Sequence, residues 1–284
     1  MSVRVLDQQP LALGTHFTAE VDGRRVEIWE PTDSHVGPRP LLLAHDGQNL
    51  FLPGRSFGGV PWGLSDAISS LPTKAVQPFV VAPWNRADIG RAADYAPQRV
   101  LQSLPDVERG FTEYFNWTEH VAAGNPIQWF GDSYAQWCAS QLLPAVQSQF
   151  GWQVNSEAIA VMGSSMGGLA SAYALALRPD VYSAALCLST HWLPGGHALA
   201  QELTGMLPPS DSGARIWFDH GTLNLDSTYG PFQLTADAVM RERGYREPDQ
   251  WRTKVYADAD HNETSWSVRL PEILRWWLLN EHEQ

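Results

Sequence analysis

Residues 158–168 read Ala-Ile-Ala-Val-Met-Gly-Ser-Ser-Met-Gly-Gly. The apolar run Ala158–Met162 predicts a short buried strand, and the pattern of Leu169–Leu177 after the glycines predicts a helix. A strand that passes through a glycine-flanked turn directly into a helix is typical of a sheet whose strands are connected by helices.

The pattern G-x-S-x-G in this turn is centred on Ser165. A frame centred on Ser164 would need glycines at Met162 and Met166. Small residues beside a serine let the backbone double back and expose the hydroxyl at the strand end. The N-terminus of the following helix favours negative charge that develops there. Ser165 is therefore the candidate nucleophile, and the alternative is a purely structural Gly-rich turn.

Similar apolar runs and helical spacings recur on both sides of this turn. Strands are predicted at Arg25–Glu30, Pro40–Ala44, Pro78–Ala82, Ala184–Ser189, Arg215–Asp219 and Trp251–Tyr256, and helices at Leu64–Leu71, Tyr134–Phe150, Pro231–Arg243 and Pro271–Asn280. Short buried strands that alternate with helices indicate a mostly parallel central sheet with helices on both faces. Ligands of such sheets bind beyond the carboxyl ends of the strands.

Two stretches, 85–130 and 191–210, interrupt the alternation. Both are rich in Pro, Gly, Trp and polar residues, and we expect them to be loop excursions over the strand ends. No linker-like change of composition divides the chain, so a single domain over residues 1–284 is expected.

A serine nucleophile needs a general base, and the base needs an acid that orients it. In this architecture the acid and then the histidine follow the serine along the chain. His261 lies in a polar turn after the last predicted strand and before the last helix. It is the predicted base, and the alternative is an ordinary surface histidine.

The predicted acid is Asp226, in the loop that follows the strand ending at Asp219. This position leaves room for the carboxylate to reach across to the histidine. Asp219 itself, Asp237, Asp258 and Asp260 remain alternatives.

Acyl transfer also needs hydrogen-bond donors for the oxyanion. One is expected from the backbone amide of Met166, which follows the nucleophile. The second is expected after an early strand, where the amide of Gln48 is the first choice and that of Asn49 the next. The alternative is that this segment forms only a turn.

Thirteen tryptophans provide candidate surfaces for stacking on a sugar or an aromatic acyl group. Trp84, Trp192 and Trp266 fall in strand-end loops or close to His261, and they are predicted to bind substrate. Arg86 is predicted to bind a carboxylate or catecholate. The alternative is that the rings cap the core and the arginine is paired within the protein.

Composition excludes several classes of partner. There are 31 acidic and 19 basic residues and a net charge of −12, which disfavours binding to nucleic acid and to anionic membranes. Two cysteines make no disulfide framework. The chain shows no apolar leader and no long apolar span, so a soluble cytoplasmic protein is expected. No metal-ligand frame, phosphate loop or dinucleotide fingerprint is present, and no metal or cofactor is expected.

Five segments together resemble the putative-esterase family of α/β-hydrolases. They are H-D-G-Q-N-L-F at 45–51, R-A-D-I-G-R-A-A-D-Y-A-P at 86–97, G-S-S-M-G-G at 163–168, G-T-L-N-L-D at 221–226 and H-N-E-T-S-W at 261–266. The family includes enterochelin and trilactone esterases, feruloyl esterases and S-formylglutathione hydrolases. Many members read His-Gly where this chain has Asp46-Gly47.

The resemblance implies an α/β-hydrolase fold and a serine esterase with Ser165, Asp226 and His261 as its triad. It also implies oxyanion amides near Gln48 and at Met166. A siderophore lactone or a small acyl ester is the expected substrate, and no cofactor is needed. The alternatives are an acyltransferase with the same triad and a catalytically silent hydrolase fold used for binding. The sequence makes no prediction of oligomeric state.

Overall fold

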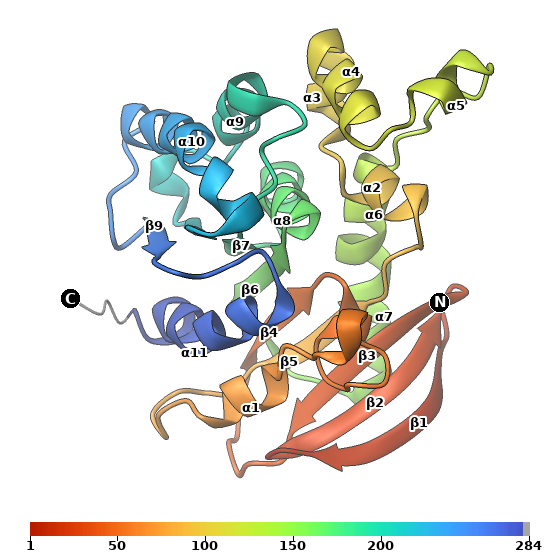
Figure 1. The fold of residues 1–284 in the computed structure, drawn as a ribbon. Helices are drawn as coiled ribbons and strands as arrows, with labels where there is room; N and C mark the ends of the chain where they lie inside the picture. The colour runs from red at the N-terminus through yellow and green to blue at the C-terminus, as the bar shows by residue number, and fades with distance from the viewer. Residues whose placement is uncertain (281–284) are drawn as a thin grey trace.

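A nine-stranded sheet runs through the computed structural model, which describes residues 1–280 (Figure 1). Its strands are β1 (Val3–Leu11), β2 (Gly14–Val21), β3 (Arg24–Pro31), β4 (Arg39–Ala44), β5 (Phe79–Pro83), β6 (Val154–Ser164), β7 (Ala184–Leu188), β8 (Arg215–Gly221) and β9 (Trp251–Tyr256). Their order across the sheet is β1-β2-β3-β5-β4-β6-β7-β8-β9. The pairs β1/β2, β2/β3 and β3/β5 are antiparallel, and all pairs from β5 to β9 are parallel. The predicted mostly parallel sheet is confirmed.

The inner parallel strands, such as β5 and β7, are buried on both faces, which is why their sequences are continuously apolar, whereas the edge strand β9 is partly exposed. In β6, Ile159 and Val161 pack into the core on one face of the sheet, whereas Ala160 and Met162 pack into the core on the other. This alternation follows from the two-residue period of a strand. The two layers of core hold the strand ends at fixed positions.

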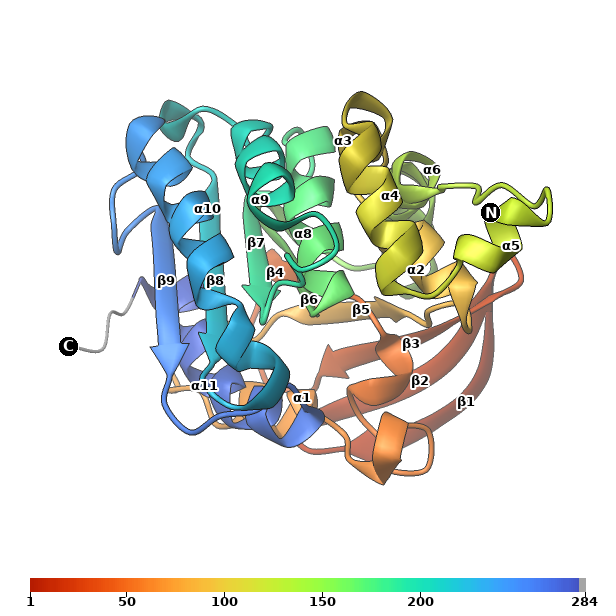
Figure 2. The ribbon, with the colours of Figure 1, turned by 45° about the horizontal axis from the view of Figure 1, so that its top comes forward.

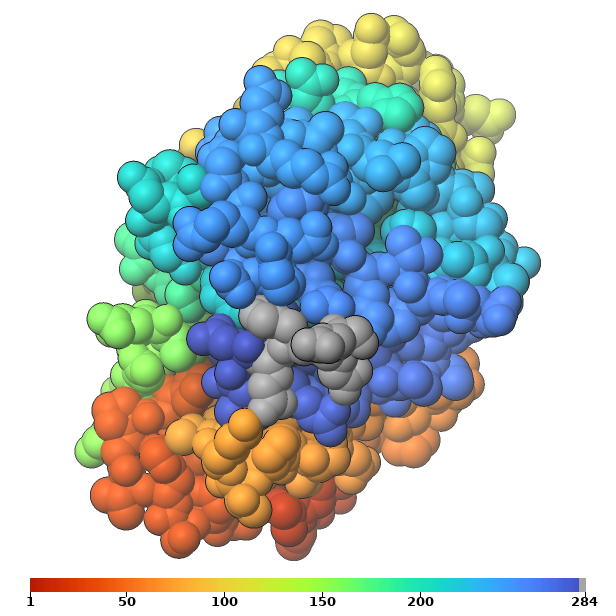
Figure 3. All heavy atoms as spheres, turned by 90° about the vertical axis from the view of Figure 1, so that its left-hand side faces the viewer, coloured from red at the N-terminus to blue at the C-terminus, as the bar shows by residue number. Residues whose placement is uncertain are grey.

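Helices cover both faces of the sheet (Figure 2). One face carries α2 (Ile89–Tyr95), α3 (Gln98–Ser103), α4 (Pro105–Tyr114), α6 (Gly131–Trp137), α7 (Leu143–Phe150), α8 (Met166–Leu177), α9 (Gly196–Gly205) and α10 (Gly230–Glu242). The other face carries α1 (Leu64–Ser69) and α11 (Glu263–Leu279). The short helix α5 (Thr118–Ala122) lies near α4. From the side of β9, segments of the C-terminal third cover the middle of the surface (Figure 3).

The two stretches expected to be loops are partly helical. Residues 85–130 contain α2 to α5, and residues 191–210 contain α9. In the first stretch, Val100, Val107 and Phe111 are buried in the core. The short helices and the many Pro and Gly residues hid this periodicity. The single domain expected over residues 1–284 stays a prediction, and its last four residues lie outside the described part.

The N-terminal strands β1 and β2 were not predicted. Most of β1 is exposed at the edge of the sheet. Two buried positions of β2 are polar: His16 Nε2 lies 2.8 Å from Glu27 Oε2 of β3, and Thr18 Oγ1 donates to the same carboxylate at 3.0 Å. The apolar alternation of β2 is therefore interrupted, whereas Val26 and Ile28 of β3 lie in the core.

Candidate active site

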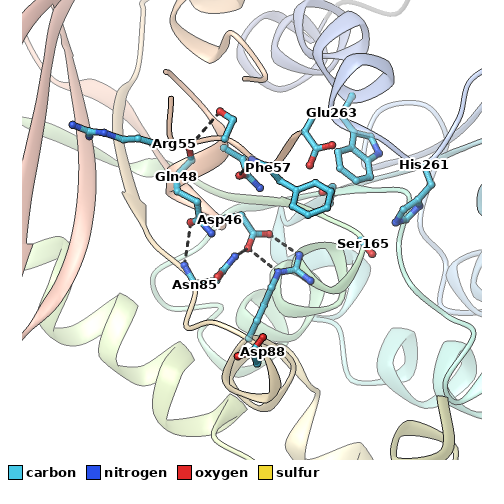
Figure 4. Close-up of a pocket in the computed structure, with 14 residues that line it drawn as sticks. Asp46, Gln48, Arg55, Phe57, Asn85, Asp88, Ser165, His261 and Glu263 are labelled. Carbon is cyan, nitrogen blue, oxygen red and sulfur yellow. Dashed lines mark hydrogen bonds and ion pairs between the residues drawn. The ribbon is translucent and has the colours of Figure 1, made fainter. Parts of the chain in front are cut away.

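A pocket of about 580 Å³ lies at the carboxyl ends of the parallel strands. Figure 4 shows Ser165 and His261 at one end of it and Gln48 and Arg55 at the other. The residues that line the pocket are Asp46, Gln48, Asn49, Arg55, Ser56, Phe57, Asn85, Asp88, Arg91, Ser164, Ser165, His261, Glu263 and Trp266. The predicted nucleophile and base therefore share one cavity.

Ser165 connects β6 to α8 in a strained conformation. Its φ of 57° and ψ of −122° lie outside the regions that side-chain-bearing residues favour. The backbone is held there by the hydrogen bond from the Ser165 amide to Leu188 O at 2.9 Å. A Cβ on Gly163 would lie 2.7 Å from the Gly167 carbonyl carbon, so the first glycine of G-x-S-x-G is required by this close approach.

The structure brings Asp226 and His261 together. His261 Nδ1 lies 2.6 Å from Asp226 Oδ1, and the carboxylate is fully buried. The turn before His261 is tied to the end of β8 because Ala259 O accepts from the Thr222 amide at 3.0 Å. A Cβ on Gly221 would lie 2.1 Å from the same oxygen. Glycine at the end of β8 therefore lets the acid and the base meet.

The environment of Asp226 favours its ionised form. Burial acts to raise the pKa of this carboxyl, but the hydrogen bond to His261 and two further donors outweigh it and lower the pKa. The further donors are Ser189 Oγ at 2.7 Å and the Gly221 amide at 2.6 Å, both to Oδ2. An ionised carboxylate can stabilise a positive charge on the imidazole.

Three of the four alternative acids, Asp219, Asp237 and Asp260, have other partners. Asp219 Oδ1 accepts from Arg269 Nη1 at 2.7 Å, and Asp237 Oδ1 accepts from Gln233 Nε2 at 2.9 Å. Asp260 Oδ1 accepts from the backbone amide of His261 at 2.7 Å, not from its ring. Among the described residues, Asp226 is the carboxylate that hydrogen-bonds the ring.

The two predicted oxyanion donors lie at the start of α8 and in the lining of the pocket. Met166 is the first residue of α8, so its amide has no partner within the helix. Gln48 lines the pocket in the short helical turn Gly47–Asn49. The amide of Asn49, the alternative, already donates to Asp46 O at 2.8 Å. The geometry therefore favours Gln48 over Asn49.

Asp46 and Arg91 form a buried ion pair beside the oxyanion turn. Arg91 Nε lies 2.8 Å from Asp46 Oδ1, and Nη2 lies 2.7 Å from Oδ2. Burial acts to raise the pKa of Asp46, but the Arg91 guanidinium and a hydrogen bond from Asn85 outweigh it and lower the pKa. Asp46, which stands where many members of the family have a histidine, is thus neutralised by Arg91. Arg91, like Arg86 a candidate from the segment 85–130, is therefore paired within the protein.

Of the predicted substrate-binding residues, Trp266 lines the pocket. Its ring centroid lies 5.0 Å from that of His261 in an edge-on arrangement. Its indole Nε1 donates to Ser189 Oγ at 3.0 Å. Trp266 therefore packs directly against the predicted base.

The other three do not line the pocket, and their predicted role as substrate-binding residues stays a prediction without support from this cavity. Trp84 Nε1 donates to Glu27 Oε1 at 2.7 Å, and Trp192 is fully buried with its Nε1 donating to Gln233 Oε1 at 3.0 Å. Arg86 pairs with Asp94, and its Nε lies 2.9 Å from Oδ2. Each side chain has its polar group satisfied by an internal partner, which the sequence could not reveal.

Two further residues around the base, His191 and Glu263, were not among the predicted site residues. His191 Nδ1 lies 2.5 Å from Tyr229 Oη, and its ring centroid lies 6.3 Å from that of His261. Burial, with the nearby His261 and Arg91, lowers the pKa of His191 to about 3, so its ring is neutral near pH 7. Glu263 lines the pocket two residues after the base, and the segment H-N-E at 261–263 is the signal that could have identified it.

No group of three or more His, Cys, Asp or Glu side chains within residues 1–280 is placed to hold a metal ion. Across the same residues, every helix is too short or too polar to cross a membrane.

Comparison with known proteins gives one family match. A family model described as putative esterase matches residues 107–277, which is more than half of the chain. A search of curated proteins finds none that matches.

Solved structures of esterases share the fold. The enterobactin and salmochelin hydrolase IroE is 17% identical with a TM-score of 0.59, over 92% of this chain and 93% of its own. An S-formylglutathione hydrolase from Agrobacterium tumefaciens is 12% identical with a TM-score of 0.60, over 97% and 98%. The enterobactin esterase FES from Shigella flexneri is 17% identical with a TM-score of 0.60, and the match spans 94% of this chain but 59% of that enzyme. These likenesses confirm the α/β-hydrolase fold.

Proposed function

The chain belongs to the putative esterase family, and from this premise we propose that it hydrolyses a carboxylic ester through an acyl-enzyme on Ser165. Membership of the family makes ester hydrolysis the activity. The serine mechanism is our inference from the site. The observation that carries it is the 2.6 Å hydrogen bond between His261 and the buried Asp226, in the same pocket as the strained Ser165.

In the proposed reaction, His261 takes the proton of the Ser165 hydroxyl as its oxygen attacks the ester carbonyl. Asp226 holds the ring in the tautomer with its proton on Nδ1 and stabilises the imidazolium that forms. The amides of Met166 and Gln48 bind the oxyanion of the tetrahedral intermediate. The imidazolium protonates the departing alcohol, and a water activated by the same ring then releases the acid.

The proposed substrate is a siderophore lactone or a small acyl ester. The lining of the pocket supports a polar ester, since it includes the amide side chains of Gln48, Asn49 and Asn85. The volume of about 580 Å³ falls within the usual range for small-molecule sites.

The test is hydrolysis of p-nitrophenyl acetate and butyrate by the wild type and Ser165→Ala. We expect kcat to fall by about 10⁴–10⁶ in the variant. Ser171→Ala is the matched control, because Ser171 lies on α8 and hydrogen-bonds Gly167 O away from the pocket lining. A wild type no faster than Ser165→Ala would refute the proposal.

Hydrolysis and acyl transfer differ in their products. Repeating the assay with and without a small alcohol separates them, since hydrolysis predicts the free acid as the main product in both cases. A new ester as the main product would favour the acyltransferase.

A further inference from the structure

We propose that Arg269 is a positioning residue of the triad, which keeps Asp226 ionised and oriented through Ser189 and Asp219. This inference rests on the proposed function, because it concerns the acid of the same triad. Arg269 lies on α11, eight residues after the base, and its side chain is 1% exposed.

One guanidinium spans two buried carboxylates. Arg269 Nη1 lies 2.7 Å from Asp219 Oδ1 and 3.0 Å from Ser189 Oγ. Arg269 Nη2 lies 3.4 Å from Asp226 Oδ2. The carboxylates of Asp219 and Asp226 are both fully buried. The arginine is thus the cation that both carboxylates share.

The hydroxyl of Ser189 has a defined direction. Its oxygen accepts from Arg269 Nη1 and from Trp266 Nε1, each at 3.0 Å. Guanidinium and indole nitrogens can only donate. The single hydroxyl proton is therefore left for Asp226 Oδ2 at 2.7 Å. Arg269 in this way fixes a donor on the side of Asp226 that faces away from the base.

The charges explain why this arrangement suits catalysis. Two carboxylates and one guanidinium carry a net charge of −1, which the imidazolium of His261 would neutralise when it forms. Without Arg269, the buried carboxylates of Asp219 and Asp226 would repel each other. The pair would then keep one proton up to a higher pH than it does in the wild type. The acid of the triad would then be partly neutral when the base needs it.

Other titratable groups surround the cluster and stay constant in the variants below. The ring centroid of Tyr256 lies 4.8 Å from Arg269 Cζ, and Tyr256 Oη donates to Glu272 at 2.8 Å, which also pairs with Lys254. On the side of the base lie Tyr229, His191, Glu263 and Arg91.

The test is the pH dependence of kcat/KM for p-nitrophenyl butyrate in three variants. Arg269→Met removes the cation, so the acid limb of the profile, where kcat/KM rises with pH, moves to higher pH by about one unit. Asp219→Asn removes an anion, so the limb moves to lower pH. The double variant Arg269→Met with Asp219→Asn removes both charges, so its acid limb returns to within about 0.3 pH units of that of the wild type. Its activity at pH 6 therefore exceeds that of Arg269→Met by about tenfold.

A fourth variant separates charge from packing. Arg269→Lys keeps the cation, so its limb stays closer to that of the wild type than the limb of Arg269→Met. Should Arg269→Met fail to fold, the opposite shift in Asp219→Asn and the limb of the double variant still test the proposal.

A merely structural role would lower activity equally at every pH and would make the double variant no better than Arg269→Met. Either result, or limbs that coincide in all variants, overturns the proposal. Failure of the proposed function is recognised separately, because Ser165→Ala would then keep the activity of the wild type.

Discussion

Replacing Arg91 with methionine leaves a buried carboxylate beside the nucleophile without its cation. The side chain of Asp46 is 3% exposed, and Arg91 makes two hydrogen bonds to it, of 2.8 and 2.7 Å. Removing one partner of such a pair costs about 3–5 kcal/mol. Asn85 and Tyr95 remain as donors to Asp46, so we expect the lower value, about 3 kcal/mol. For a chain of this size the corresponding fall in Tm is roughly 6–12 °C.

The effect of Arg91→Met depends on pH in a defined direction. In the wild type the pKa of Asp46 is lowered, so the ionised carboxylate stabilises the fold above its unfolded pKa, and this contribution is lost as the pH falls. In the variant, burial without the cation raises the pKa of Asp46, and the fold is penalised above the unfolded pKa. The difference in free energy of unfolding is therefore largest near pH 7–8 and shrinks below about pH 4.

Urea denaturation followed by tryptophan fluorescence at pH 4, 6 and 8 measures this difference. The double variant Arg91→Met with Asp46→Asn is the matched control, since it removes the unpaired charge and should regain most of the lost stability. A cost below about 1 kcal/mol at pH 8, or a cost that does not change with pH, would refute the reasoning.

Two further predictions follow from close packing. Gly163→Ala places a Cβ 2.7 Å from the carbonyl carbon of Gly167. The variant should lose about 1–3 kcal/mol in free energy of unfolding and should have a lower kcat. A variant with wild-type Tm and kcat would contradict the need for glycine in this turn. Cys138 and Cys187 are buried, and burial raises the pKa of both thiols, that of Cys138 to about 12. Ellman's reagent at pH 8 should therefore label no thiol in the native protein and both in guanidinium chloride, whereas rapid labelling of the native protein would contradict their placement.

The strands of the parallel part were predictable because burial on both faces gives them continuous apolar runs, as in Ala158–Met162. The hairpin β1–β2 was not, because most of β1 is exposed and two buried positions of β2 hold His16 and Thr18, which bind Glu27 of β3. The helices within residues 85–130 escaped prediction because each is only 5 to 10 residues long. A sequence pattern reveals periodic burial, and these segments show too little of it.

Chain order and turn chemistry made His261 and Asp226 the first choices and left four other carboxylates open; the structure brings His261 and Asp226 within 2.6 Å of each other, and their catalytic roles stay predictions. The tryptophans show where such reasoning ends. Trp192 and Trp266 both come after predicted strands along the chain, yet Gln233 satisfies the first within the core and Ser189 holds the second, on α11, against the base. Contacts between residues this far apart along the chain arise only in the folded protein.

The central claim, that Ser165 is the nucleophile and His261 its base, is tested most directly by labelling with a fluorophosphonate. The account predicts one adduct per chain, on the peptide that contains Ser165. In His261→Ala, adduct formation should slow by about 10³ or more. An adduct on another residue, or a wild type that hydrolyses esters without being labelled or inhibited, would contradict it.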